Sequence, residues 1–289
     1  MSAPLRFSKY EGLGNDFVIV DGRTQDLALA AEHAVALCDR HRGIGADGVL
    51  LVELGGGTPA MRVINADGSR PEMCGNGIRC VALYLKHSGF LQARADAPIE
   101  VTIETDSGPH RCRLWRDAAT DWIEVAMRPA SLDPASLPVL DARGATPLLD
   151  EVFEVDGTRV RLSCVSMGNP HAVTFDDIGE ARSALGPRLG THRRFEHGAN
   201  IGFARMIGPQ QIELAVWERG AGFTQACGTG ACAAAVAAVE TGRAERNTAI
   251  EVRLPGGPLH ILVGDRSQPI LMTGPARAVF HGDVDVPAR

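Results

Sequence analysis

The sequence predicts an α/β (α+β) protein of two pseudo-symmetric domains, each a mixed, mainly antiparallel sheet wrapped around a central helix. Three observations predict this fold: the chain repeats itself, each half carries strand and hairpin patterns, and one expected helix is apolar on every face. With 289 residues, of which 45% are hydrophobic and 22% charged, the chain is long enough to form two globular cores.

The repeat is visible in landmarks that return in one order, 151 to 154 residues later. They are Leu13–Val18 with Met167–Ala172, Met73–Gly77 with Ala226–Gly230, and Ile99–Val101 with Ile250–Val252. In both halves a glycine that can end a helix follows 15 residues after the cysteine, at Gly89 and Gly242. The sequence therefore predicts an N-terminal half over residues 1–130 and a C-terminal half over 131–276. A proline-rich stretch near 129–147 joins them, and the segment 277–289 is expected to pack on the first half.

The elements follow from periodicity and from turn residues. In the first half we expect strands at 16–20, 49–54 and 61–64, a helix at 28–37, a helix after Cys74, and a hairpin of 99–105 with 111–115 around Ser107-Gly108-Pro109. In the second half we expect a strand at 212–217, a helix at 231–239, and a hairpin of 250–254 with 259–263 around Pro255-Gly256-Gly257. Because the helix at 231–239 is apolar all round, it must be buried on every side, and its alanines allow strands to approach closely.

Composition excludes several classes of function. The net charge of −6 provides no basic face for nucleic acid, and the longest apolar run, Ala231–Val239, is too short to span a membrane. The first ten residues contain no apolar stretch typical of a secretory leader, which predicts a cytoplasmic protein whose seven cysteines stay reduced. With only Lys9 and Lys86 as possible Schiff-base lysines, a pyridoxal phosphate enzyme is not expected. No cysteine or histidine pair has the spacing of a zinc site, so no metal is expected.

One glycine-rich segment matches a nucleotide-binding pattern only formally. Residues 43–48 read Gly-Ile-Gly-Ala-Asp-Gly, but they follow a helical pattern and enter a strand, whereas a dinucleotide fingerprint leaves a strand and opens a helix. The segment is interpreted as a turn.

Cys74 and Cys227 each stand where a loop enters a helix, followed by glycines. The free amides and the positive dipole end at such a position favour negative charge, which predicts a lowered pKa for both thiols and a site for a ligand carboxylate. Two such thiols on opposite sides of one carbon could act as base and acid in turn, which inverts a stereocentre without a cofactor. The other five cysteines lack this glycine setting and are interpreted as buried apolar side chains: Cys38, Cys80, Cys112, Cys164 and Cys232.

Several segments together resemble the diaminopimelate epimerase family, from Phe7 to Gly274. They are Gly12–Phe17, Asn65–Ser69, Met73–Cys80, Ser166–His171, Glu218–Gly222 and Gln225–Cys232. The two Cys-Gly-x-Gly turns alone would suit the related proline racemases equally well, but the Glu-Arg-Gly-Ala-Gly and Asn-Ala-Asp-Gly segments favour the epimerase.

The resemblance implies a cofactor-independent isomerase that interconverts LL- and meso-2,6-diaminopimelate, a step towards lysine and peptidoglycan, and a cytoplasmic homodimer. It implies that Cys74 and Cys227 exchange the alpha proton, with the site in the cleft between the halves and His171 in a supporting role. It also implies a set of substrate-binding positions: Asn15, Asn65, Gly75, Asn76, Asn169, Asn200, Glu218, Arg219, Gly228 and Thr229. Arg219 suits a bidentate grip on the distal carboxylate, and Glu218 suits an ammonium group.

Two features depart from the pattern. Gly48 stands where many family members have a glutamine, and residues 191–198 carry no motif that we can assign. Two alternatives of other kinds remain open besides a proline- or hydroxyproline-type racemase of the same fold. One is an amino-acid-binding protein that uses the same helix ends, and the other is a redox protein in which Cys74 and Cys227 form a reversible disulfide.

Overall fold

The computed structural model describes residues 4–25, 29–92, 97–137, 139 and 147–285. The chain forms two compact units, Met1–Val125 with Thr273–Arg289, and Ala126–Met272. The chain leaves the first unit after residue 125 and re-enters it after residue 272. The sequence predicted these two boundaries after residues 130 and 276. The C-terminal strand accordingly belongs to the first unit.

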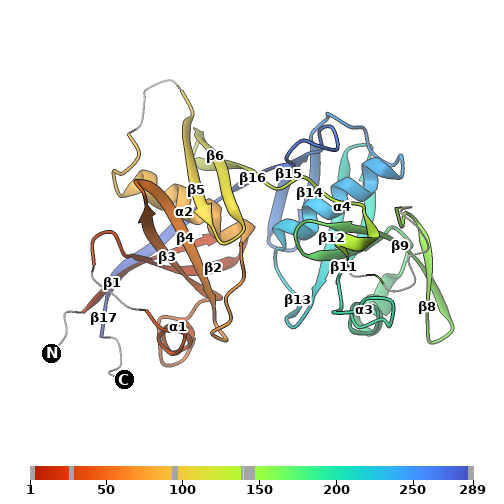
Figure 1. Ribbon diagram of the computed structural model, residues 1–289, viewed down its shortest axis with the longest axis horizontal. Helices are drawn as coiled ribbons and strands as arrows, with labels where there is room; N and C mark the ends of the chain where they lie inside the picture. Colours follow the sequence, from red (N-terminus) through yellow and green to blue (C-terminus); the bar gives the residue numbers. More distant parts are fainter. Residues whose placement is uncertain (1–3, 26–28, 93–96, 138, 140–146, 286–289) are drawn as a thin grey trace. The chain divides into compact units, whose positions relative to one another are not determined.

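The first unit is one mixed sheet around a helix (Figure 1). Its strands are β1 (Leu5–Gly12), β2 (Asn15–Asp21), β3 (Gly48–Gly55), β4 (Thr58–Asn65), β5 (Ile99–Thr105), β6 (Gly108–Asp117), β7 (Thr120–Ala126) and β17 (Arg277–Val284). Neighbouring strands pair in the order β17, β1, β2, β3, β4, β5, β6, β7. The pairs β2–β3 and β4–β5 are parallel and the others in this order are antiparallel.

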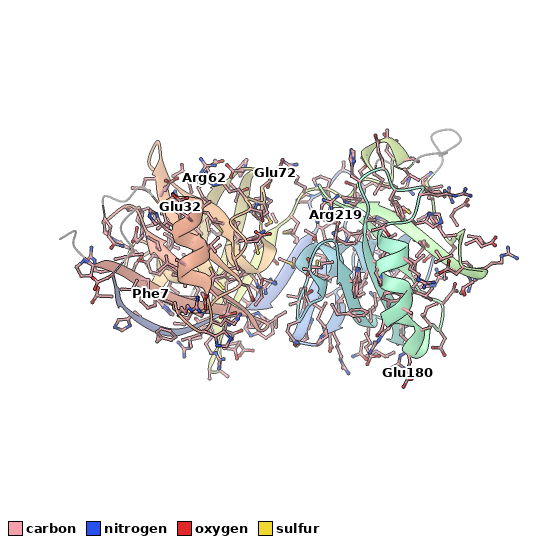
Figure 2. The ribbon with its side chains drawn as sticks, turned by 90° about the horizontal axis from the view of Figure 1, so that it is seen from below. Phe7, Glu32, Arg62, Glu72, Glu180 and Arg219 are labelled. Carbon is pink, nitrogen blue, oxygen red and sulfur yellow. The ribbon has the colours of Figure 1, made fainter. Side chains whose placement is uncertain are left out.

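Helix α2 (Gly75–His87) lies inside this sheet and contacts β1 to β6 and β17. Leu83 and Leu85 are buried in its last turns, and the charged side chain of Arg79 is buried as well. Helix α1 (Ala31–Cys38) instead packs on β3 and β4 from outside, with Glu32 on its exposed side (Figure 2). The cysteine helix is therefore the core of the unit, and its first turn is buried.

The second unit repeats this plan. Its strands are β8 (Glu151–Val155), β9 (Thr158–Ser166), β10 (Pro170–Thr174), β11 (Asn200–Gly208), β12 (Gln211–Glu218), β13 (Gly222–Phe223), β14 (Ile250–Leu254), β15 (Gly257–Leu262) and β16 (Leu271–Pro275), the last of which runs on into the first unit. The order β8, β9, β10, β11, β12, β14, β15 has parallel pairs at β10–β11 and β12–β14, the equivalents of β2–β3 and β4–β5.

Helix α4 (Gly228–Glu240) is the central helix of the second unit and contacts β9, β10, β11, β12, β14 and β15. Its run of alanines is fully buried, which confirms the expectation that a helix apolar on every face is enclosed by strands. Helix α3 (Arg182–Gly190) packs outside on β11 and β12, as α1 does in the first unit. Two short 3₁₀ turns, η1 (Pro134–Ser136) and η2 (Gly179–Ala181), complete the elements of this unit.

The predicted fold is confirmed, with local differences. The helix expected at 28–37 begins at Ala31, because Ala30 is extended and its amide donates to the His33 ring; Ala28 lies outside the described residues. The helix expected at 231–239 extends over 228–240. The structure also contains elements that were not predicted: strands β1, β7, β8, β9, β10, β11, β13, β16 and β17 and helix α3.

Candidate active site

The two cysteines occupy the same position at the start of the two central helices. Cys74 is the N-cap of α2, with φ −133° and ψ 113°, and Cys227 is the N-cap of α4, with φ −123° and ψ 104°. The Cys74 sulfur accepts a hydrogen bond from the Gly77 amide, with a sulfur–nitrogen distance of 3.3 Å. Because the first amides of a helix have no partner within it, each cysteine stands beside donors that can hold an anion.

The third residue after each cysteine is a glycine with little room for a side chain. A Cβ at Gly77 would lie 3.0 Å from the Leu50 side chain and 3.3 Å from the Cys74 Cβ. A Cβ at Gly230 would lie 3.0 Å from the Val216 side chain and 3.1 Å from the Cys227 sulfur. The glycines allow the cysteine side chain to fold back over its own helix start.

The prediction of a lowered pKa is wrong for Cys227. Burial raises the pKa of this thiol well above its ordinary value, and the negative charge of Glu218 raises it further. The hydrogen bonds from Thr229 and the Gly230 amide act in the opposite direction but do not overcome these two causes. Cys227 is therefore a thiol in this structure, because the helix dipole does not compensate for burial beside a carboxylate.

In the first unit the structure brings Asn15 and Asn76 together. The Asn76 amide nitrogen donates to the Asn15 oxygen over 3.0 Å, and Asn15 lies at the start of β2 while Asn76 lies in the first turn of α2. Asn65, the last residue of β4, donates to the Ser69 hydroxyl over 2.9 Å. Gly48 stands opposite Asn65 on β3, and a Cβ there would lie 2.9 Å from the carbonyl oxygen of Ile64.

In the second unit Asn169 lies beside His171. The Asn169 oxygen and the His171 Nε2 atom are 3.0 Å apart. Complete burial lowers the pKa of His171 to about 3, so the ring is neutral. Thr229, the second residue of α4, has its hydroxyl 3.7 Å from the Cys227 sulfur.

Arg219 is held by Asn200 and by the segment 191–198. The Arg219 amide donates to the Asn200 side chain over 2.9 Å, and its guanidinium donates to the carbonyl oxygen of His197 over 2.6 Å. Gly198 has φ 73°, and a Cβ there would lie 3.3 Å from the Arg219 Cδ atom. The segment without a motif thus supports Arg219, which lies by the C-terminal end of α3 (Figure 2).

Glu218 is the last residue of β12, next to Arg219. Its carboxylate accepts a hydrogen bond from the Thr224 hydroxyl over 2.5 Å. No motif in the sequence indicated that Thr224 would bond to Glu218 or that His197 would bond to Arg219.

All seven cysteines are free thiols. Among the described residues, no cluster of histidine, cysteine and acidic side chains could hold a metal ion. Within the same ranges, the helices are all too short or too polar to cross a membrane. Burial raises the pKa of Cys38 to about 11 and those of Cys112 and Cys164 to about 12, which suits inert core side chains.

Comparisons with solved structures find the same fold. The chain superposes on a probable proline racemase from Agrobacterium radiobacter K84 with bound carbonate, with a TM-score of 0.71, 16% identity, and coverage of 98% of this chain and 93% of the other. A hydroxyproline epimerase from Agrobacterium vitis with bound trans-4-hydroxy-L-proline gives a TM-score of 0.66 at 16% identity, covering 98% and 91%.

Sequence comparisons are more specific. A diaminopimelate epimerase from Acaryochloris marina is 44% identical over 283 residues, covering 96% of this chain and 98% of the relative. A diaminopimelate epimerase from Microcystis aeruginosa is 43% identical over 283 residues, covering 96% and 97%. The sequence model of diaminopimelate epimerase matches residues 7–132 and 163–279. The chain belongs to the diaminopimelate epimerase family.

Proposed function

We propose that this protein interconverts LL- and meso-2,6-diaminopimelate by moving a proton at the alpha carbon, without a cofactor, on the route to lysine and peptidoglycan precursors. The observation that carries the proposal is the placement of Cys74 and Cys227 at the same N-cap position of two buried helices. The substrate is proposed from relatives of 43% and 44% identity that span nearly the whole chain.

The reaction needs a base on one face of the alpha carbon and an acid on the other. One thiolate removes the alpha proton and becomes a thiol, while the opposite thiol gives its proton to the other face and becomes a thiolate. The C–H bond breaks on one face and forms on the other, so the net protonation of the enzyme is unchanged. In the reverse direction the two cysteines exchange roles.

The amides at the helix starts are proposed to hold the carboxylate attached to the reacting carbon. Gly75 and Asn76 begin α2, and Gly228 and Thr229 begin α4. Negative charge grows on this carboxylate as the alpha proton leaves, and fixed donors that meet this charge stabilise the transition state. Glycine at the first helical position allows the carboxylate to approach the backbone closely.

Cys227 starts the cycle as the acid. Burial and the nearby Glu218 keep its pKa raised, so the thiol retains its proton until substrate is bound. Cys74, whose sulfur accepts a hydrogen bond from the Gly77 amide, is then the base of the resting enzyme. His171 is neutral and supports Asn169 rather than acting as a charged group.

The remaining polar residues are proposed to bind the substrate. Arg219, positioned by Asn200 and His197, takes the distal carboxylate, and Glu218 faces an ammonium group. Asparagine supplies both a donor and an acceptor without net charge, which suits a substrate with two carboxylates and two ammonium groups. Asn15, Asn65, Asn76 and Asn169 are assigned to this role.

The setting of the reaction is also proposed. We infer that the enzyme is a cytoplasmic homodimer that takes a small-molecule substrate, with no nucleic-acid or membrane partner. Analytical ultracentrifugation tests the dimer, and a monomer at micromolar concentration would contradict it.

The function is tested with purified protein, LL-diaminopimelate and no added cofactor. We expect the meso isomer to form until both isomers coexist, as resolved by chiral chromatography, and we expect neither L-proline nor trans-4-hydroxy-L-proline to be converted. Conversion of the proline compounds instead would indicate the related racemase activity. Binding of diaminopimelate without conversion would indicate a binding protein, and a disulfide between Cys74 and Cys227 that turns over with a thiol partner would indicate a redox role.

A further inference from the structure

A run of hydrogen bonds in the first unit joins four side chains from distant parts of the chain. Arg79 Nη2 donates to Asn76 Oδ1 over 3.0 Å, and Asn76 Nδ2 donates to Asn15 Oδ1 over 3.0 Å. Asn15 Nδ2 then donates to Asp47 Oδ2 over 2.6 Å. Helix α2 supplies the first two residues, β2 supplies Asn15, and the turn before β3 supplies Asp47. We name this run the amide relay.

The two ends of the amide relay fix the direction of every bond within it. A guanidinium can only donate hydrogen bonds, and a carboxylate can only accept them, whereas a side-chain amide can be turned to do either. If the Asn76 amide were turned round, its NH₂ group would face the Arg79 donor. If the Asn15 amide were turned round, its oxygen would face the Asp47 carboxylate. Both asparagines are therefore held in one orientation.

The donor end is anchored in the core. The Arg79 side chain is fully buried and also donates from Nη1 to the Gly75 carbonyl and from Nε to the Pro275 carbonyl, each over 3.2 Å. Gly12 makes room for it, since a Cβ there would lie 3.1 Å from Arg79 Nη2. A buried guanidinium with several fixed acceptors has no freedom to follow a turned Asn76 amide.

The acceptor end is anchored by charge. Asp47 Oδ2 also accepts from the Asp16 amide over 3.1 Å, and Asp47 Oδ1 accepts from Arg40 over 2.8 Å. Arg40 and Lys9 both pair with Asp16, and although burial raises the pKa of Asp16, their hydrogen bonds and charges lower it overall. The carboxylates of Asp16 and Asp47 and the cations of Lys9 and Arg40 thus form one cluster of charges next to Asn15.

The second unit has no amide relay at the equivalent positions. Cys232 stands five residues after Cys227, where Arg79 stands five residues after Cys74, and Thr229 stands where Asn76 does. Thr229 lies against the Cys227 sulfur, and Asn169 faces a histidine ring that can donate or accept according to its tautomer. The fixed direction is a property of the first unit.

We propose that Arg79 and Asp47 are positioning residues, which set the orientation of the Asn76 and Asn15 amides and so the face that these asparagines present to the substrate. The proposal deepens the proposed function, because it takes Asn15 and Asn76 as substrate contacts. It assigns roles to a buried cation and a carboxylate that do not themselves touch the substrate.

The sharpest test is Asn15→Asp, which has the same shape as Asn15 but replaces a donor by an acceptor. The new carboxylate faces the Asp47 carboxylate, with Asp16 nearby and Lys9 and Arg40 as the cations behind them. Two carboxylates at this distance share a proton, so one of them binds it with a raised pKa. When the two carboxyl groups share a proton, a hydrogen bond between position 15 and Asp47 is restored. When both are ionised, no donor stands between them.

The first readout needs no substrate. Because a raised folded-state pKa contributes stability at low pH that is lost as pH rises, the destabilisation of Asn15→Asp relative to wild type should grow with pH. Between about pH 5 and about pH 8 we expect the ratio of the two folding equilibrium constants to change by about tenfold or more. A ratio that is constant, or that moves in the favour of the variant as pH rises, would overturn the fixed direction of the amide relay.

The second readout is kinetic. At each pH, the KM of Asn15→Asp for diaminopimelate is divided by the wild-type KM. We expect this KM ratio to fall as pH falls. The corresponding kcat ratio should change less, because Asn15 orients the substrate and moves no proton. If the stability result is as expected but this KM ratio is independent of pH, Asn15 does not contact substrate and the proposed positioning role fails. If wild type converts no diaminopimelate, the proposed function fails while the stability readout still tests the relay.

Asn247→Asp is the control, since Asn247 is exposed to solvent and its new carboxylate should titrate near the ordinary value. Its stability ratio to wild type should stay nearly constant between about pH 5 and about pH 8. A second variant, Arg79→Lys, keeps the buried charge but cannot reach three separate acceptors. We expect its KM to rise several-fold more than its kcat falls, and an unchanged KM would contradict the role of Arg79.

Discussion

Cys74 and Cys227 have nearly the same backbone conformation, with φ −133° and −123° and ψ 113° and 104°, at the N-caps of two helices of 13 residues each. Their environments nevertheless differ. Cys227 is buried beside Glu218, and burial and the carboxylate raise its pKa. Cys74 is only half-buried, so the duplicated scaffold places its two thiols in different surroundings. Under the proposed mechanism this difference suits a base and an acid that act in one cycle.

Replacing either cysteine with serine should abolish epimerisation while leaving the fold intact. A hydroxyl is a much weaker acid than a thiol, so we expect kcat to fall by at least about 100-fold in Cys74→Ser and in Cys227→Ser. Chiral chromatography measures the rate, and circular dichroism measures the fold. The control is Cys112→Ser, a buried cysteine of the core, for which kcat should stay within a few-fold of wild type. Full activity in either N-cap variant would contradict the two-thiol mechanism.

Gly230→Ala should displace the Cys227 sulfur. The added Cβ would lie 3.0 Å from Val216 Cγ2 and 3.1 Å from the Cys227 sulfur, so one of the two must move. We expect a destabilisation of about 1 to 3 kcal/mol, measured by urea unfolding, and a fall in kcat of more than about tenfold. Gly55→Ala is the control, because nothing lies within 4 Å of its Cβ position. Equal effects of the two substitutions would argue against the crowding.

Glu218→Gln should lower the pKa of Cys227 towards its ordinary value. The amide removes the negative charge that raises this pKa, while the burial of the thiol remains. The pKa is measured from thiolate ultraviolet absorbance as the difference between proteins with and without Cys227. Glu213→Gln is the matched control, because Glu213 is exposed on the same strand and pairs with Arg205. If both variants leave the titration of Cys227 unchanged, Glu218 does not govern it.

Glu240 should control acid stability of the second unit. It lies in the last turn of α4, and although burial raises its pKa, hydrogen bonds from Arg266 and Arg246 lower it overall. A lowered folded-state pKa contributes stability above the ordinary pKa of about 4.3, which is lost as pH falls through the folded value. Glu240→Gln should therefore unfold about 1 kcal/mol more easily at neutral pH and lose less stability on acidification.

Urea unfolding at neutral pH and at about pH 3 measures this difference. The control is Glu180→Gln, an exposed glutamate in η2, which should follow the wild-type dependence on pH. An identical acid dependence of Glu240→Gln and wild type would contradict the role of the Glu240 pairs.

The repeat explains why the sequence alone predicted so much of the fold. A conserved spacing of two cysteines and their glycines located both central helices, and the apolar run of α4 required burial on every side. Strands such as β1 and β17 were not predicted, because their apolar residues are interrupted by charged ones and their pairing joins opposite ends of the chain. The start of α1 depended on a single bond from Ala30 to His33, which periodicity does not reveal.

The electrostatics of the candidate site were not predictable from the sequence. The dipole argument applied to Cys227 considered the helix alone, whereas its pKa depends on burial and on Glu218, which becomes a neighbour only when β12 and α4 pack together. Likewise Asn15 and Asn76 are 61 residues apart, so nothing local indicated that they bond or that Arg79 and Asp47 orient them.

The most direct measurement is deuterium incorporation into LL-diaminopimelate in deuterated water without any cofactor. The two-thiol account predicts that each molecule of meso product carries deuterium at its inverted alpha carbon, whereas LL substrate recovered early contains little deuterium, since the proton is taken and given by different cysteines. Meso product that carries no deuterium from the solvent would contradict the two-thiol account. So would a rate of meso formation that is unchanged after Cys74 or Cys227 is replaced.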